Sequence, residues 1–250
     1  MDFDMKNLWL ITKADFINLI KNPMWIFYGT AFPILLVAIV GYLTHSAYGN
    51  EVTSYDYYGV TLMIYSALSS GMTSANSFME ERIRKANMRI IYAPGDVRSI
   101  YLSKIIASFL FSFLLHMADA VFLALVFHIN YHAAAYLIVF LALIELFAVT
   151  LGIMMCCIFK TESMTNQIQG LLVNLLALLG GTLFSLDGYG KTARAISQIS
   201  PVKWIVDASF QIIYDSDFHL FTPTIGIMTG SILFMLRICK ITFRKENCIC

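Results

Sequence analysis

Three ionisable side chains lie inside long apolar runs of this chain. His116 and Asp119 fall within the run 105–127, and Glu145 falls within the run 133–159. Ionisable groups are costly in hydrocarbon, and they usually pair with one another or serve the movement of ions, protons or substrates. They are therefore the first candidates for chemistry in this sequence.

The turn between the two runs determines how these side chains meet. Residues 128–132 form a short turn, so the two helices are expected to be antiparallel neighbours. At 1.5 Å per residue, His116 lies ~16 Å and Glu145 ~18 Å from that turn, which places them at matching depth. Asp119 lies one helical turn from His116 on the same face. The sequence predicts one polar cluster near mid-membrane, and two interpretations stay open: a hydrogen-bonded clasp with protonated carboxyls, or a transport path.

The helices that must position this cluster follow from composition. Hydrophobic residues make up 58% of the chain and charged residues 13%, whereas a soluble domain carries about a quarter charged residues. Apolar runs of about 20 residues are long enough to cross a bilayer as helices. We therefore predict an all-α membrane protein with six transmembrane helices, a domain over 23–250. The expected spans are 24–43, 57–79, 105–127, 133–159, 166–186 and 223–241.

Two further segments are predicted to be helical without crossing the membrane. Residues 1–22 carry one apolar helical stripe, formed by Met5, Leu8, Trp9, Thr12, Phe16, Leu19 and Ile20. Lys6, Lys13, Asn18, Lys21 and Asn22 lie off this stripe, which indicates an amphipathic helix in the membrane interface. Between the last two spans, the sequence predicts a short extracellular helical hairpin, over 193–199 and 202–214 with Pro201 between them. An ordinary surface loop is the alternative for this second segment.

The positive charges predict the orientation. With both termini cytoplasmic, the cytoplasmic side holds all the Lys and Arg residues except Lys191, Arg194 and Lys203. Cytoplasmic loops carry such an excess. The expected location is the cell membrane, as a multi-pass protein in contact with lipid, and the net charge of +1 indicates no nucleic-acid partner.

The second span is rich in small residues. Ser66, Ser70 and Ser74 lie along one edge, next to an edge of alanine and glycine. Small residues let membrane helices approach closely. The pattern favours a packing face, within the chain or in a dimer, over a polar lining of a path.

The loop from Glu80 to Lys104 carries the clearest pattern outside the spans. It begins with Glu80-Glu81-Arg82, continues with the apolar Ile90-Ile91-Tyr92 and Pro94, and ends at Lys104, which opens the third span. A second pattern, ISPVKWIVDA, occupies 199–208. With these patterns the chain resembles the ABC-2 type permeases, the membrane subunits of type V ABC exporters. It departs from the family at 85–87, where Lys-Ala-Asn stands in place of the common Gly-Thr pair.

The resemblance implies a half-transporter. A second permease subunit, identical or related, would complete the path, and a cytoplasmic ABC ATPase subunit would bind the N-terminal helix and the coupling loop 80–104. ATP and Mg would be held by that ATPase, so no cofactor is expected on this chain and the chain itself is not expected to be an enzyme. The implied cargo is an amphiphilic molecule moved outward: a drug, an antimicrobial peptide or a lipid-linked molecule. The residues expected to couple to the ATPase are Glu80, Glu81, Arg82, Arg84, Lys85, Ile90, Ile91 and Pro94.

The competing class is a stand-alone secondary transporter or channel that uses the His116, Asp119 and Glu145 cluster. It leaves the N-terminal helix and the charged loop without a role. No nucleotide or metal site is expected here: the segment GYGKT at 188–192 lacks the first glycine of a phosphate loop, because Ser185 stands there. We also expect no catalytic residues, since the sequence contains no recognisable nucleophile motif.

Overall fold

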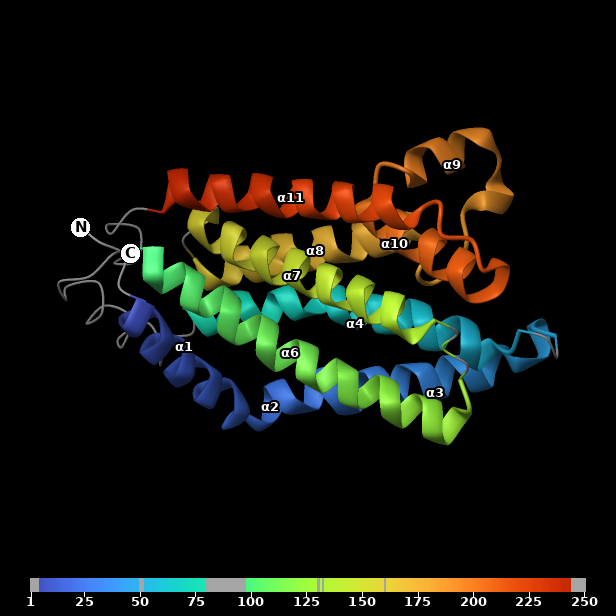
Figure 1. Cartoon of the computed structure of the whole chain (residues 1–250), viewed down its shortest axis with the longest axis horizontal. Coiled ribbons are helices and arrows are strands. Elements are labelled where there is room, and N and C mark those ends of the chain that lie inside the picture. Colours follow the sequence, from blue (N-terminus) through green and yellow to red (C-terminus); the bar gives the residue numbers. More distant parts are fainter. Residues whose placement is uncertain are drawn as a thin grey trace.

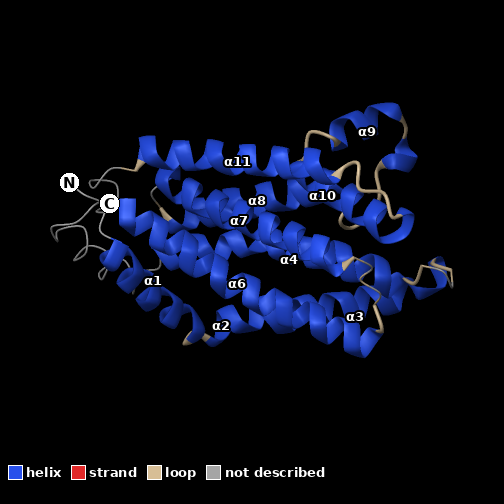
Figure 2. Cartoon of the chain, in the orientation of Figure 1, coloured by secondary structure: helices blue, strands red, loops and turns tan. Residues whose placement is uncertain are grey.

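The structure, a computed structural model, describes residues 5–49, 52–79, 98–129, 131, 133–159 and 161–243. Figures 1 and 2 show that this part of the chain is helical and contains no strand, as the all-α prediction requires. The long helices run side by side along the long axis (Figure 1). The helices are α1 Met5–Ile20, α2 Pro23–Ile26, α3 Phe32–Thr44, α4 Ser54–Met79, α6 Arg98–Phe127, α7 Ala134–Phe159, α8 Glu162–Gly180, α9 Lys191–Ser197, α10 Pro201–Phe210 and α11 Phe221–Thr242.

A sharp change of direction separates α1 from the first predicted span. The Asn22 side chain accepts a hydrogen bond from the Met24 backbone N–H at 3.1 Å, and Pro23 occupies the first turn of α2. Asparagine before a helix and proline in its first turn both favour a new helix start. The chain then passes through a π-helical segment, Phe27–Ala31, which ends just before Pro33 in α3. A proline has no N–H to donate, so a local widening of the helix before it is expected.

The core forms where α4 packs against α7, α8 and α6. Ala67 and Ala75 of α4 are completely buried, and the Ser74 hydroxyl donates to the Val149 carbonyl oxygen of α7 at 3.2 Å. A Cβ at Gly152 of α7 would collide with the carbonyl oxygen of Gly71 of α4. The small residues of α4 are thus a packing face within the chain, which is the first of the two interpretations considered above.

Four stretches are long and apolar enough to cross a membrane: Pro23–Ala47, Ser99–Phe127, Ala134–Phe159 and Phe221–Thr242. The other two expected spans correspond to α4 and α8, and among the described residues these two do not reach that apolarity. Their sequences explain this, since α4 is rich in serine and threonine and α8 carries four amide side chains. Four apolar spans are therefore established by composition, and the count of six stays a prediction.

The helix expected over 166–186 has different bounds in the structure. It begins at Glu162 and ends at Gly180, because Gly181 adopts a left-handed conformation with φ of 74° and the Thr182 N–H bonds back to the Ala177 carbonyl at 3.1 Å. This is the geometry by which glycine commonly ends helices. The Gly180-Gly181 pair in the sequence carried that signal.

The segment between α8 and α11 contains the two short helices expected from the sequence. They are α9 and α10, and α10 continues into a π-helical turn, Gln211–Asp215. Figure 1 shows both near one end of the bundle, whereas the first turns of α1 and the last turns of α11 lie at the opposite end. Val202 and Ile205 are fully buried, so α10 packs into the bundle instead of lying on its surface.

Candidate functional site

The three helices α4, α6 and α7 bring together a hydrogen-bonded line of side chains. His116 Nδ1 bonds to Glu145 Oε1, and His116 Nε2 lies 2.9 Å from Ser66 Oγ. Glu145 is 0% exposed and His116 is 2% exposed. We call Ser66, His116 and Glu145 the buried triad. The predicted meeting of His116 with Glu145 is confirmed by this contact.

The buried triad has hydrogen-bonding capacity left over. A carboxylate beside Nδ1 favours the tautomer in which that nitrogen donates, so Nε2 of a neutral ring accepts from the Ser66 hydroxyl. Glu145 Oε2 has no hydrogen-bond partner among the described residues, and the same holds for Asp119 Oδ2. Asp119 is buried near His116 but is not joined to it by a hydrogen bond in the described part of the chain. The predicted cluster therefore contains one bonded pair and one neighbouring carboxyl.

The order serine, histidine, carboxylate is also that of the catalytic triad of hydrolases. Such catalysis needs backbone or side-chain donors that point at a developing oxyanion. Ser66 lies in the middle of α4, where the backbone N–H groups are used by the helix itself. The arrangement therefore fits a polar link between helices better than a hydrolytic site.

A second buried contact lies at the other end of α6, where α1 crosses it. Lys104 Nζ forms an ion pair with Asp15 Oδ1, and Ser103 Oγ lies 3.3 Å from Asp15 Oδ2 and 2.8 Å from the Ile100 carbonyl oxygen, which share its one proton. Lys104 is 1% exposed. Burial raises the pKa of Asp15, and the neighbouring Lys104 ammonium opposes that rise. We call Asp15, Ser103 and Lys104 the α1–α6 joint.

The α1–α6 joint determines which face of α1 is covered. Leu8, Thr12, Asp15 and Leu19 are buried at helical spacing. The apolar stripe expected from the sequence is therefore split, since its Leu8 and Leu19 are buried while others in it are exposed. The exposed large apolar side chains of α1 are Met5, Trp9, Leu10, Ile17 and Ile20.

The expected coupling residues lie outside the described residues. They are Glu80, Glu81, Arg82, Arg84, Lys85, Ile90, Ile91 and Pro94. Of the loop 80–104, the structure describes the part from Arg98 onward, which forms the first turns of α6.

Comparison with protein families decides the class. A model of the ABC-2 type transporter family matches residues 6–214, from α1 to the turn after α10. The chain belongs to the ABC-2 type transporter family. A comparison with curated proteins finds no match. As a member of this family the chain is a membrane permease component of a transporter, and the predicted resemblance to the ABC-2 type permeases is confirmed by the match.

Two features of this ABC-2 family member were not predicted from sequence. Ser66 was noted for its size and not as a partner of His116, and the ion pair of Asp15 with Lys104 was not anticipated. The signal for Asp15 was present, because Leu8, Thr12, Asp15 and Leu19 share one face of a helix. No feature of the sequence indicated that Lys104 would be its partner.

Proposed function

We propose that this chain is the membrane subunit of an ATP-driven exporter that moves an amphiphilic molecule out of the cell. A separate cytoplasmic ABC ATPase subunit supplies the energy, and a second permease subunit completes the path. The family match favours this function over a stand-alone secondary transporter or channel. The structural observation that best supports this function is the α1–α6 joint, because it connects α1, which is not among the candidate spans, to the candidate span in α6.

The α1–α6 joint explains how movement at the membrane edge reaches the spans. A buried ion pair with an added hydrogen bond holds its two helices in one geometry, because separating the charges leaves each unpaired in a dry site. Displacement of α1 therefore displaces the start of α6. The exposed apolar residues on the other face of α1, Trp9 and Leu10 among them, offer contact to lipid headgroups or to a partner.

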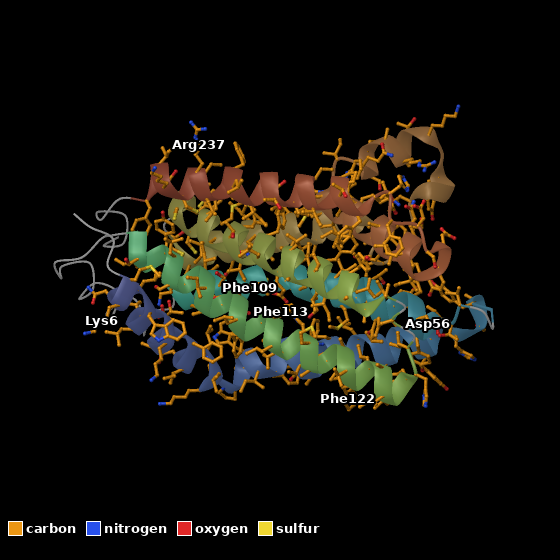
Figure 3. All side chains as sticks on the ribbon, in the orientation of Figure 1. Lys6, Asp56, Phe109, Phe113, Phe122 and Arg237 are labelled. Atoms are coloured by element: carbon orange, nitrogen blue, oxygen red, sulfur yellow. The ribbon has the colours of Figure 1, made fainter. Side chains whose placement is uncertain are left out.

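The proposed orientation places the joint on the cytoplasmic side. Figure 3 shows Lys6 and Arg237 toward one end of the bundle and Asp56 toward the opposite end. In a background without the five native cysteines, an impermeant thiol reagent applied to intact cells should label Lys191→Cys and not Arg89→Cys. The reverse pattern would overturn the orientation and with it the cytoplasmic partner.

The proposed second subunit would cover α8. Leu171 and Leu175 are exposed on this helix, and the amides of Gln167 and Asn174 are exposed beside them. Amide groups are poorly suited to lipid and associate with other helices or line a polar path. The mixed face of α8 thus fits a subunit interface next to the translocation path.

The proposed ATPase contact is tested in the loop 80–104. Replacing Ile90 and Ile91 by Asp should leave the permease inserted, because both residues lie outside the spans, but should remove the apolar contact to the ATPase. The double variant is expected to lose the ATPase subunit on purification in detergent and to lose substrate-stimulated ATP hydrolysis. Arg89→Ala serves as the control, since it alters charge and leaves the apolar residues in place. Full copurification and normal transport by the double variant would contradict the proposal.

A further inference from the structure

A cavity of about 210 Å³ lies between α4, α6 and α7. Its walls are apolar, with Met63 of α4, Ala120 of α6 and Leu141 of α7 among the residues that line it. Two other lining residues, Val121 and Ile138, are exposed on the outside of the bundle, so the cavity opens toward the surroundings of the helices. Both belong to stretches that are apolar enough to span a membrane, so we take lipid to be the medium at the entrance.

The residues of the buried triad do not themselves line this cavity, but each lies about one helical turn beyond a residue that does. Ser66 is three residues beyond Met63, His116 is four residues before Ala120, and Glu145 is four residues beyond Leu141. Residues three or four apart share a face of a helix. On each of the three helices, the triad residue therefore continues the helix face that lines the cavity. All three triad residues lie beyond the end of the cavity that is farther from the turn between α6 and α7.

Acidic side chains outnumber basic ones near this end of the cavity. Two carboxyls, Asp119 and Glu145, and one imidazole, His116, are buried there, and each carboxyl retains an oxygen without a partner in the described part of the chain. The buried ammonium of Lys104 belongs to Asp15, twelve residues or ~18 Å along α6 from His116. A buried carboxylate oxygen without a donor is costly, so the site is suited to a ligand that brings one N–H donor and a positive charge.

We propose that the cavity binds the apolar body of a hydrophobic amine that enters from the lipid, with the ammonium group donating to Glu145 Oε2. An apolar cavity of ~150 Å³ is enough to hold benzene, so this cavity accommodates a substituted aromatic ring. The inference deepens the proposed function by naming a cationic amphiphile as the class of cargo, and it rests on that function only in taking the bound amine to be cargo.

The test uses two photoreactive probes of equal shape on the full-length protein in lipid nanodiscs. One is the trifluoromethyl-diazirinyl derivative of benzylamine, and the other is the same derivative of toluene, which lacks the amine. After irradiation, modified peptides are mapped by mass spectrometry. The amine probe is expected to modify Met117, Val121 or Leu141 at least tenfold more than the toluene probe does, and excess unlabelled benzylamine should suppress this modification.

Variants assign the two parts of the site. Glu145→Gln keeps the side-chain shape and removes the charge, so it should reduce modification by the amine probe to the level of the toluene probe. Ala120→Phe, with Leu141→Phe made in parallel, fills the cavity and should reduce modification by both probes. Phe122→Trp is the control, because Phe122 points away from the bundle on the same helix (Figure 3). Elution as a single species in size-exclusion chromatography verifies folding for each variant.

The inference would be overturned by equal modification of the cavity by the two probes, or by modification with the amine probe that Glu145→Gln leaves unchanged. Absence of any modification in the cavity would have the same consequence. The readout needs no ATPase, so failure of the proposed ATPase coupling would leave the amine site intact and would be recognised separately by the copurification experiment.

Discussion

The α1–α6 joint and the buried triad are both buried acid–base contacts on α6, yet they differ in how completely they are satisfied. In the joint, Asp15 Oδ1 meets Lys104, and Asp15 Oδ2 lies 3.3 Å from the Ser103 hydroxyl, whose one proton is shared with the Ile100 carbonyl oxygen at 2.8 Å. In the triad, Glu145 Oε1 meets His116 while Glu145 Oε2 has no partner among the described residues. A carboxylate with a polar partner near each oxygen indicates a structural connection, and a carboxylate oxygen without any partner indicates a position that a donor from a ligand could complete.

The positions of the two contacts agree with that difference. The triad lies on helix faces that line the cavity, whereas the joint lies ~18 Å further along α6. A ligand that arrives from the membrane would approach Glu145 along the apolar walls of that cavity. We therefore expect substitutions in the joint to act on stability and coupling, and substitutions in the triad to act on binding and transport.

The largest effect is expected in the joint. Asp15→Ala leaves Lys104 buried without a counter-charge, and breaking a buried pair from one side costs about 3–5 kcal/mol. Thermal unfolding in detergent should show a large loss of melting temperature. The double variant Asp15→Leu with Lys104→Met removes both charges and should regain most of the stability. If the single variant melts like the wild type, the joint does not hold α1 to α6.

The joint and the triad also differ in how far the sequence revealed them. The contact of His116 with Glu145 followed from helix geometry, because a short turn fixes the pairing of two adjacent helices and the rise per residue fixes their depth. Asp15 and Lys104 are 89 residues apart and belong to helices joined by several other elements. Sequence periodicity predicts which face of α1 is buried, but it does not predict which helix packs against that face.

The helices and their ends also differ in how well the sequence predicts them. The all-α architecture, the short helices α9 and α10 and the apolar spans were predicted from local composition, which is a property of each segment by itself. The end of α8 at Gly180 depends on the left-handed conformation of Gly181, and hydrophobicity does not report backbone conformation. The close approach of Gly71 to Gly152 could also be found only in the structure, because small residues indicate a packing face but do not indicate which helix packs against it.

A second prediction concerns the packing that brings the triad helices together. Gly152 of α7 lies against the backbone of Gly71 of α4, so Gly152→Ala forces the two helices apart. Overpacking of this kind costs about 1–3 kcal/mol. The displacement should lower the melting temperature and weaken transport together, because Ser66 and Glu145 sit on the displaced helices.

The control for this substitution is Gly170→Ala in α8, where an added Cβ meets nothing within 4 Å. Alanine is favoured over glycine inside a helix by about 0.5–1 kcal/mol, so this variant should melt at or slightly above the wild-type temperature. Equal melting temperatures for Gly152→Ala and Gly170→Ala would show that the approach of α4 to α7 is not tight.

The smallest effect on stability, and the most informative one on function, is expected for Glu145→Gln. The amide oxygen keeps an acceptor for His116 Nδ1, so the unfolding free energy should change by no more than about 1 kcal/mol. If Glu145 belongs only to a clasp between helices, transport stays normal, because a neutral amide serves a clasp as well as a protonated carboxyl does. If Glu145 binds the cargo, transport of a cationic amphiphile falls at least tenfold while the permease still assembles with its partners. Normal transport by Glu145→Gln would reduce the triad to a structural contact like the α1–α6 joint and remove the functional difference between the two regions.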